Sequence, residues 1–265
     1  MTKTIPPILS TKVKGDRHLR KHMLTHENEE MHGIRVRGLE VTRLEGLTDA
    51  MFGFAITLLI VSLEPPTEFN QLVNLVLSFP AFAITFLLML FIWYWHYRYF
   101  RQYGLNSGKV MWVNGILLFL VLLFVYPLKF IATIVIDYVV LEGWFGFNMP
   151  AELTIGPGQY PVLHTLYAVG FASVFLCFSW LYKLALDAKH ELKLTPYEVL
   201  STRTHVVMYL IVAAVPLATI ALVWMPTPWA PMIAGFSNCL IWPATMIYAR
   251  SMRPKFATLR EAEAG

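Results

Sequence analysis

The sequence predicts an all-α membrane protein with six transmembrane helices and both termini in the cytoplasm. Of its 265 residues, 57% are hydrophobic and 14% are charged, whereas soluble domains carry about 25% charged residues. Six apolar stretches are separated by segments that contain proline, glycine or charged residues, which is typical of a multi-pass membrane protein. The basic residues gather in the segments on one side of these stretches, and the acidic loops lie on the other.

The first 42 residues predict a cytoplasmic N-terminal tail, because residues 1–42 are polar and mixed in charge. They contain no apolar core region, so we expect no cleavable signal peptide. His18, His22 and His26 recur every four residues and would share one face of a helix. We interpret them as exposed side chains on a solvated helix, with a metal site as the alternative.

The first predicted membrane helix lies within residues 43–66. Its uncharged run, residues 50–63, covers roughly 21 Å and is shorter than the ~30 Å hydrocarbon slab. Pro65 and Pro66 follow it and end the helix, because proline lacks the amide N–H. A short helix with charges at both ends suits a central position, surrounded by protein and in contact with water at its two ends.

One stripe of this helix has the spacing of a face packed in the core and is also a candidate lining for a pore. Phe54, Thr57, Leu58 and Val61 are spaced i, i+3, i+4 and i+7, which places them on one helical face. Apolar rings at such positions can close a pore by dewetting, and Thr57 adds a hydroxyl among them. The alternatives are ordinary packing in the protein core and, for the threonine, a hydrogen bond to its own i−4 carbonyl.

Hydropathy predicts the positions of the remaining five helices. The second contains Pro80, which predicts a kink, and it ends in an aromatic belt that begins at Trp93 and is typical of a membrane–water boundary. The spans predicted after the first are residues 72–97, 110–136, 162–186, 205–224 and 232–249. Residues 43–250 are therefore predicted to form one transmembrane domain, and residues 251–265 a cytoplasmic C-terminal tail.

The distribution of charge predicts the orientation in the membrane. Basic residues fall in the N-terminal tail, the second-to-third loop, the fourth-to-fifth loop and the C-terminal tail, and only Lys129 lies outside this side. The opposite loops carry acidic residues and no basic one: Glu64, Glu68, Asp137, Glu142 and Glu152. The positive-inside rule therefore places both termini in the cytoplasm, and the acidic outer loops would raise the local cation concentration.

The first helix resembles that of a known channel family. Arg43, then Leu47-Thr48-Asp49, then Phe52-x-x-Ala-Ile-Thr-Leu-Leu resembles the signature of the transmembrane protein 175 family of potassium channels. Its pattern has Phe-Ser-Asp where this chain has Leu-Thr-Asp. The segment VNGILLFLVLLFVYPLKF from Val113 also resembles the family, so the likeness extends from residue 43 to 129. It implies four copies around an axis, with the first helix central and Phe54 in the narrowest layer.

The resemblance also implies a polar network that braces the first helix. Arg43 and Asp49 of the signature would join a Trp and a His of the second helix and an Asn of the third, which correspond to Trp93, His96 and Asn114. The alternative for the aspartate is an ordinary cap at a helix N-terminus. A lone histidine at an interface can likewise be part of the packing.

Other functional classes lack support in the sequence. No hydrolase, metalloprotease or phosphate-binding motif is present, Cys177 and Cys239 have no metal-ligand spacing, and the basic residues follow membrane topology rather than a nucleic-acid surface. We therefore predict a potassium-permeable homotetrameric channel of the plasma membrane, with lipid and its own copies as partners and no cofactor besides the permeant ion. The alternatives are a secondary transporter or proton-coupled carrier, with Lys129 the closest ionisable mid-span residue, and a non-conducting relative in which Phe54 plugs the axis.

Overall fold

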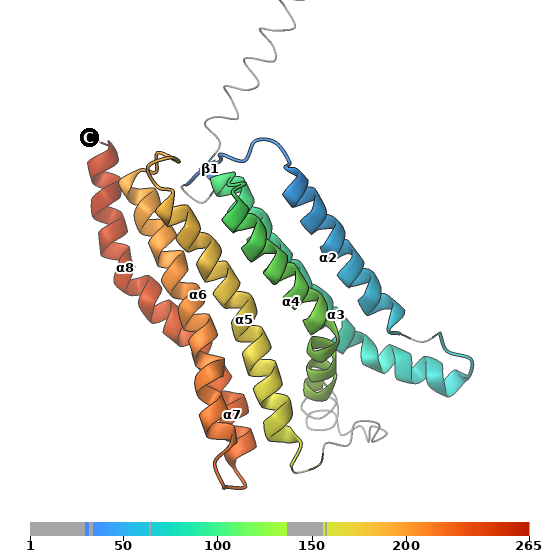
Figure 1. Ribbon diagram of the computed structural model, residues 1–265. Coiled ribbons are helices and arrows are strands. Elements are labelled where there is room, and N and C mark those ends of the chain that lie inside the picture. Colours follow the sequence, from blue (N-terminus) through green and yellow to red (C-terminus); the bar gives the residue numbers. More distant parts are fainter. Residues whose placement is uncertain (1–29, 32–33, 64, 137–155, 157, 265) are drawn as a thin grey trace, which may run out of the picture.

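The computed structural model describes residues 30–31, 34–63, 65–136, 156 and 158–264, which form a bundle of long helices (Figure 1). Six spans in this part of the chain are long and apolar enough to cross a membrane, which confirms the predicted number. The first five are α2 (Arg43–Val61), α3 (Phe69–Tyr103), α4 (Gly108–Ile134), α5 (Tyr160–Asp187) and α6 (Pro196–Val223). The sixth comprises α7 (Ala230–Ser237), the 3-10 turn η2 (Asn238–Leu240) and α8 (Ile241–Ala264).

Capping residues explain where several helices begin and end. Thr42 accepts a hydrogen bond from the Glu45 amide and Thr195 accepts one from the Glu198 amide, so capping boxes start α2 and α6. Gly104 ends α3 in the left-handed conformation, with φ of 59°. Because these signals lie outside the apolar stretches, α3 and α6 extend beyond the spans predicted from hydropathy, to Tyr103 and back to Pro196 respectively.

Helix α3 changes direction along its length. Its first part, drawn in cyan, projects away from the bundle, whereas its second part packs beside α2 and α4 (Figure 1). Pro80 lies inside the helix, where it removes a backbone hydrogen bond and favours a bend. The kink that the sequence predicts at this proline is therefore consistent with the observed path.

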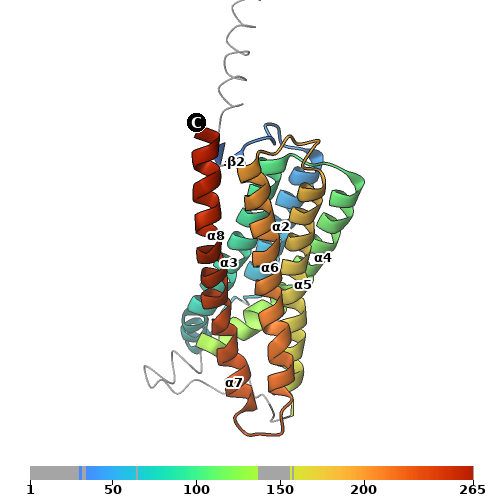
Figure 2. The same ribbon diagram turned by 90° about the vertical axis from the view of Figure 1, so that its left-hand side faces the viewer.

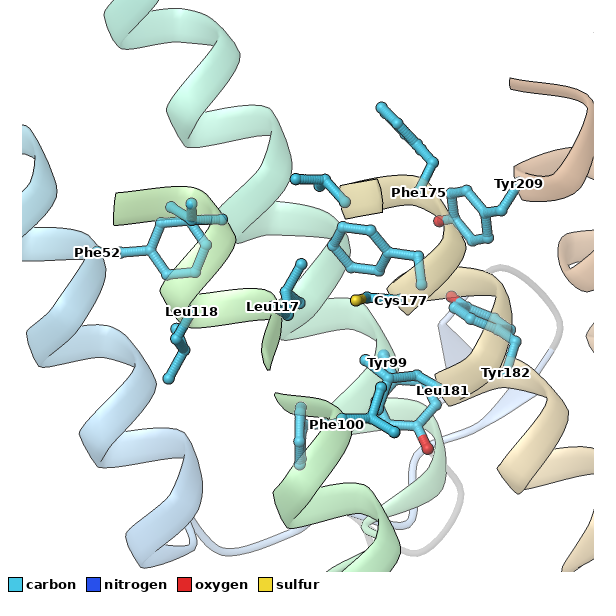
Figure 3. Packing of buried hydrophobic residues seen from close by; sticks show 14 of the residues in the cluster. Phe52, Tyr99, Phe100, Leu117, Leu118, Phe175, Cys177, Leu181, Tyr182 and Tyr209 are labelled. Carbon is cyan, nitrogen blue, oxygen red and sulfur yellow. The ribbon is translucent and has the colours of Figure 1, made fainter. Parts of the chain in front are cut away.

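The core is an aromatic and aliphatic cluster contributed by five helices. Figure 3 shows residues of this cluster from α2 to α6, with side chains directed toward one another. The labelled members are Phe52, Tyr99, Phe100, Leu117, Leu118, Phe175, Cys177, Leu181, Tyr182 and Tyr209. Among the described helices, α5 and α6 pack against each other most extensively. Helix α8 lies at the opposite side of the bundle from α2 (Figure 1), and Figure 2 shows α8 beside α6.

One end of the bundle collects the positive charge, and we call it the basic end. Helices α2, α4 and α6 begin here and α3, α5 and α8 end here, at the top of Figure 1. A short hairpin of β1 (Glu30–Met31) and β2 (Ile34–Arg35) precedes α2 at this end. The N-terminal histidines and the acidic residues Glu64, Asp137, Glu142 and Glu152 of the sequence prediction lie outside the described residues.

Candidate functional site

Helix α2 has one buried face and one uncovered face. Its buried residues recur at helical spacing and pack mainly on α3 and α4; they are Glu45, Thr48, Phe52, Ala55 and Leu59. The uncovered face lies at the edge of the bundle (Figure 1). A Cβ atom added to Gly46 or Gly53 would meet no other atom within 4 Å, so this face is open along two turns.

The residues predicted to line the pore lie on or beside the uncovered face. Phe54 is 56% exposed and Val61 is 69% exposed, Thr57 is also exposed, and Leu58 is half-buried. Ordinary packing in the core of their own chain therefore does not explain Phe54, Thr57 or Val61. A surface that is apolar and uncovered over most of a membrane helix is available to lipid, to another subunit or to a pore.

The hydroxyl of Thr57 is oriented by its own helix. It donates a hydrogen bond to the Gly53 carbonyl over 2.9 Å, the i−4 bond that the sequence analysis set out as the alternative. A hydroxyl that donates its proton keeps its oxygen lone pairs. Because Thr57 is exposed, this oxygen can still accept from water or coordinate a cation.

Four of the five residues predicted for the polar network form two hydrogen-bonded groups. Trp93 Nε1 donates to Asp49 Oδ1 over 2.8 Å. His96 Nε2 donates to Asn114 Oδ1 over 2.7 Å, and Asn114 Nδ2 donates to Thr48 Oγ1 over 2.9 Å. The second group is buried, with Asn114 and Thr48 at 0% exposure, and it ties α2, α3 and α4 together with satisfied polar groups.

Arg43 stands apart from these two groups. It is exposed in the first turn of α2, and the hydrogen bonds of the network do not reach it. Thr48, in contrast, belongs to the network although the sequence analysis treated it only as a replacement within the motif. Its helical spacing with Phe52, Ala55 and Leu59 was the signal that would have placed it on the packed face.

The far end of α2 carries a second set of contacts that the sequence analysis did not predict. Lys129 Nζ donates to the backbone carbonyl of Ser62 over 3.1 Å and to its hydroxyl over 2.8 Å. Ser62 is the C-cap of α2, where a cation interacts favourably with the helix dipole. Lys129 is therefore engaged in holding α2 to α4. Within the described ranges, no group of three His, Cys, Asp or Glu residues could hold a metal ion.

Comparison with known proteins agrees with this architecture. The family described as "Endosomal/lysosomal potassium channel TMEM175" matches residues 43–125. A "Potassium channel" of Marivirga tractuosa is 34% identical over 221 residues, covering 81% of this chain and 88% of that protein. A potassium channel of Chamaesiphon minutus is 27% identical over 157 residues, covering 56% of this chain and 68% of that protein.

The fold also matches a solved channel structure. A crystal structure of a threonine-to-alanine variant of the potassium channel MtTMEM175, in complex with a nanobody fusion, superposes with a TM-score of 0.75 at 31% identity, covering 85% of this chain and 99% of that chain. The family match over residues 43–125, the relative that is 34% identical over 221 residues and the six-span bundle all indicate the same family. The chain is a multi-pass membrane protein that belongs to the TMEM175 family of potassium channels.

Proposed function

We propose that this protein is a potassium-permeable channel of the plasma membrane, in which four copies surround a pore lined by α2. The observation that carries the proposal is the uncovered face of α2, on which Phe54, Thr57 and Val61 are exposed while the opposite face is buried. Relatives named as potassium channels support potassium as the permeant ion. No cofactor is part of the proposal.

A single helix cannot enclose a pore, so α2 needs copies around an axis. Cyclic symmetry provides these copies with one repeated interface. The other five spans would form the outer scaffold, since α6 and α8 lie on the far side of the bundle from α2 (Figure 1). Open space beside Gly46 and Gly53 would allow close approach of neighbouring helices.

Selection along this pathway would combine apolar rings with a hydroxyl layer. Phe54, Leu58 and Val61 would form constrictions that dewet and close. The Thr57 oxygen, held by its bond to Gly53, would partly replace the hydration shell of a passing ion. The basic end would face the cytoplasm under the positive-inside rule.

Potassium flux into proteoliposomes tests this function. We expect wild-type protein to carry potassium down a gradient at a rate that rises with concentration without saturating. We expect Phe54→Ala to increase the flux, because a smaller side chain widens the narrowest apolar ring. The matched control is Phe236→Ala, an equally apolar change at a residue that is 71% exposed on α7, across the bundle from α2 (Figure 1).

The outcomes separate the alternatives. Saturable, substrate-dependent flux that is insensitive to Phe54→Ala would indicate a carrier. Flux that is absent in the wild type and appears in Phe54→Ala would indicate a non-conducting relative whose axis is plugged by the phenylalanine ring. Equal effects of the Phe54 and Phe236 substitutions would contradict a pore lined by α2.

A further inference from the structure

Residues 34–42 form a strap across the basic end of the bundle. The strap starts in β2, where Ile34 is 1% exposed, and it ends at Thr42, the N-cap of α2. From sequence, residues 34–42 are predicted to belong to the N-terminal tail. In the structure, its hydrogen bonds tie it to three helices, α2, α3 and α6.

The strap is attached to α6 through Glu198, which is 2% exposed. Nη1 and Nη2 of Arg37 donate to the two carboxylate oxygens over 3.0 and 2.6 Å, and the Arg35 amide donates to Oε1 over 2.9 Å. Arg37 Nε donates to the Leu192 carbonyl over 3.0 Å, and the Thr195 amide donates to Glu198 Oε2 over 3.0 Å. Removal of the cationic partner would leave an uncompensated buried charge on Glu198, which strongly destabilises a folded protein.

The strap is attached to α3 through backbone contacts. The amides of Arg37 and Gly38 both donate to the Arg101 carbonyl over 3.0 Å, and Arg101 Nη1 donates to the Gly38 carbonyl over 2.6 Å. A Cβ on Gly38 would overlap the Phe100 carbonyl. Gly104, with φ of 59°, lies directly against the Arg37 carbonyl, so both glycines permit an approach that larger residues would prevent.

The strap reaches α2 through its first turn. The Glu45 carboxylate accepts from the Thr42 amide over 3.3 Å, and Thr42 Oγ1 accepts from the Glu45 amide over 3.2 Å. Arg101 Nη2 lies 3.9 Å from Glu45 Oε2. Because α2 packs mainly on α3 and α4, the strap is its connection to α6.

We infer that Arg37 and Glu198 are a positioning pair for ion conduction, which sets the first turn of α2 by fastening the strap to α6. The inference rests on the proposed function, since it takes α2 as the pore helix. A shift of α6 at the basic end would pull the strap and change the angle or rotation of α2. Release of the pair would leave the strap attached to Glu198 through the Arg35 amide, and the first turn of α2 would depend more on α3 and α4.

A double-mutant cycle in the full-length protein tests this inference. The variants are Arg37→Gln, Glu198→Gln and both together, with Arg203→Gln as the control, because Arg203 is exposed on the same helix, α6. Each is measured by hydrogen–deuterium exchange of residues 43–50 and by potassium and sodium flux in proteoliposomes. Exchange of residues 117–125 in α4 and elution of the assembled protein report on the rest of the fold.

We expect Arg37→Gln to speed exchange of residues 43–50 about tenfold, because it leaves the buried Glu198 carboxylate without its cation. Potassium flux should fall several-fold at an unchanged potassium-to-sodium ratio, and residues 117–125 should exchange as in the wild type. The double variant should recover part of the loss, since neutral glutamines can hydrogen-bond without a buried charge. The Arg203→Gln control should behave as wild type.

Unchanged exchange of residues 43–50 in Arg37→Gln would overturn the inference, as would an equal acceleration across α4, which would indicate general unfolding. The exchange measurement does not depend on conduction. A wild-type protein that carries no potassium would therefore refute the proposed function, while the exchange rates would still decide whether the strap positions α2.

Discussion

At the scale of single residues, Thr57 forms a hydrogen bond within its own helix and is proposed to take part in ion selection. Its hydroxyl donates a hydrogen bond to the Gly53 carbonyl over 2.9 Å, while the side chain remains exposed. We expect Thr57→Val to lower the preference for potassium over sodium several-fold with little effect on expression, because the change removes the oxygen but keeps the side-chain shape. Flux ratios in proteoliposomes measure this. The control is Thr245→Val on α8, which removes a similar i−4 bond, to Ile241, away from α2.

An unaltered flux ratio in an assembled Thr57→Val protein would remove this residue from the selective layer. A similar change in the Thr245→Val control would show that the effect arises from the loss of any helix-bonded hydroxyl, rather than from the pore.

Asn114 and Asp49 differ in how much of the fold depends on them. Asn114 is 0% exposed and bonded on both sides, to His96 and Thr48, whereas Asp49 is exposed and bonded to Trp93. We expect Asn114→Ala to destabilise the protein by about 1–2 kcal/mol and Asp49→Ala to destabilise it less. Size-exclusion profiles after heating report both. Asn106→Ala, in an exposed loop, is the control.

A greater loss of stability in Asp49→Ala than in Asn114→Ala would contradict this order. The bracing role that the family resemblance implies for Asp49 also predicts that its loss affects assembly or stability more than ion preference. An intact Asp49→Ala assembly that conducts as the wild type does would refute that role.

At the scale of elements, the approach of α4 to α5 depends on one glycine. A Cβ on Gly170 would overlap the ring of Phe124. We expect Gly170→Ala to cost about 1–3 kcal/mol through overpacking and Gly170→Ala with Phe124→Ala to recover part of it, as measured by thermal denaturation. The control is Gly115→Ala in α4, where a Cβ would meet no atom within 4 Å. It should be neutral or slightly stabilising.

Gly170→Ala with wild-type stability would show that α4 and α5 can separate without cost. No recovery in the double variant would indicate that a contact other than the Phe124 ring limits the packing at this position.

At the scale of the whole molecule, the uncovered face of α2 is the surface through which we expect copies of the chain to assemble. The apolar core contains residues of the five helices from α2 to α6 and buries one face of α2 (Figure 3). The opposite face of α2 remains uncovered. We expect a native mass about four times the 30.3 kDa of one chain. In a Cys239→Ser background, Phe54→Cys should form intermolecular disulfides on oxidation, because residues around a narrow axis come close enough to bond.

Phe236→Cys in the same background is the control for this cross-linking, since α7 lies across the bundle from α2 (Figure 1). Cys177 is buried and stays in place. Cross-linking through position 236 but not through position 54 would mean that subunits meet by the opposite side, and it would contradict a central α2.

The sequence by itself determined the class of protein, the number of spans and the family. These features depend on residues that lie close together in the chain: the hydropathy of each stretch, the charges at the helix ends and the motif that begins at Arg43. The six spans of the structure match the predicted ones, but several helices begin or end at other residues. The ends shifted where a capping residue such as Thr195 or Gly104 lies outside the apolar stretch.

Only the tertiary structure decided which faces and partners are used. It placed Thr48 in the buried network, left Arg43 outside it, and brought Arg37 to Glu198 across 161 positions of the sequence. It also left Phe54 uncovered. Periodicity states which residues share a helical face, but the rotation of each helix is set by packing against neighbours that are distant in the sequence. That rotation determined which stripe of α2 was buried and which remained available for a pore.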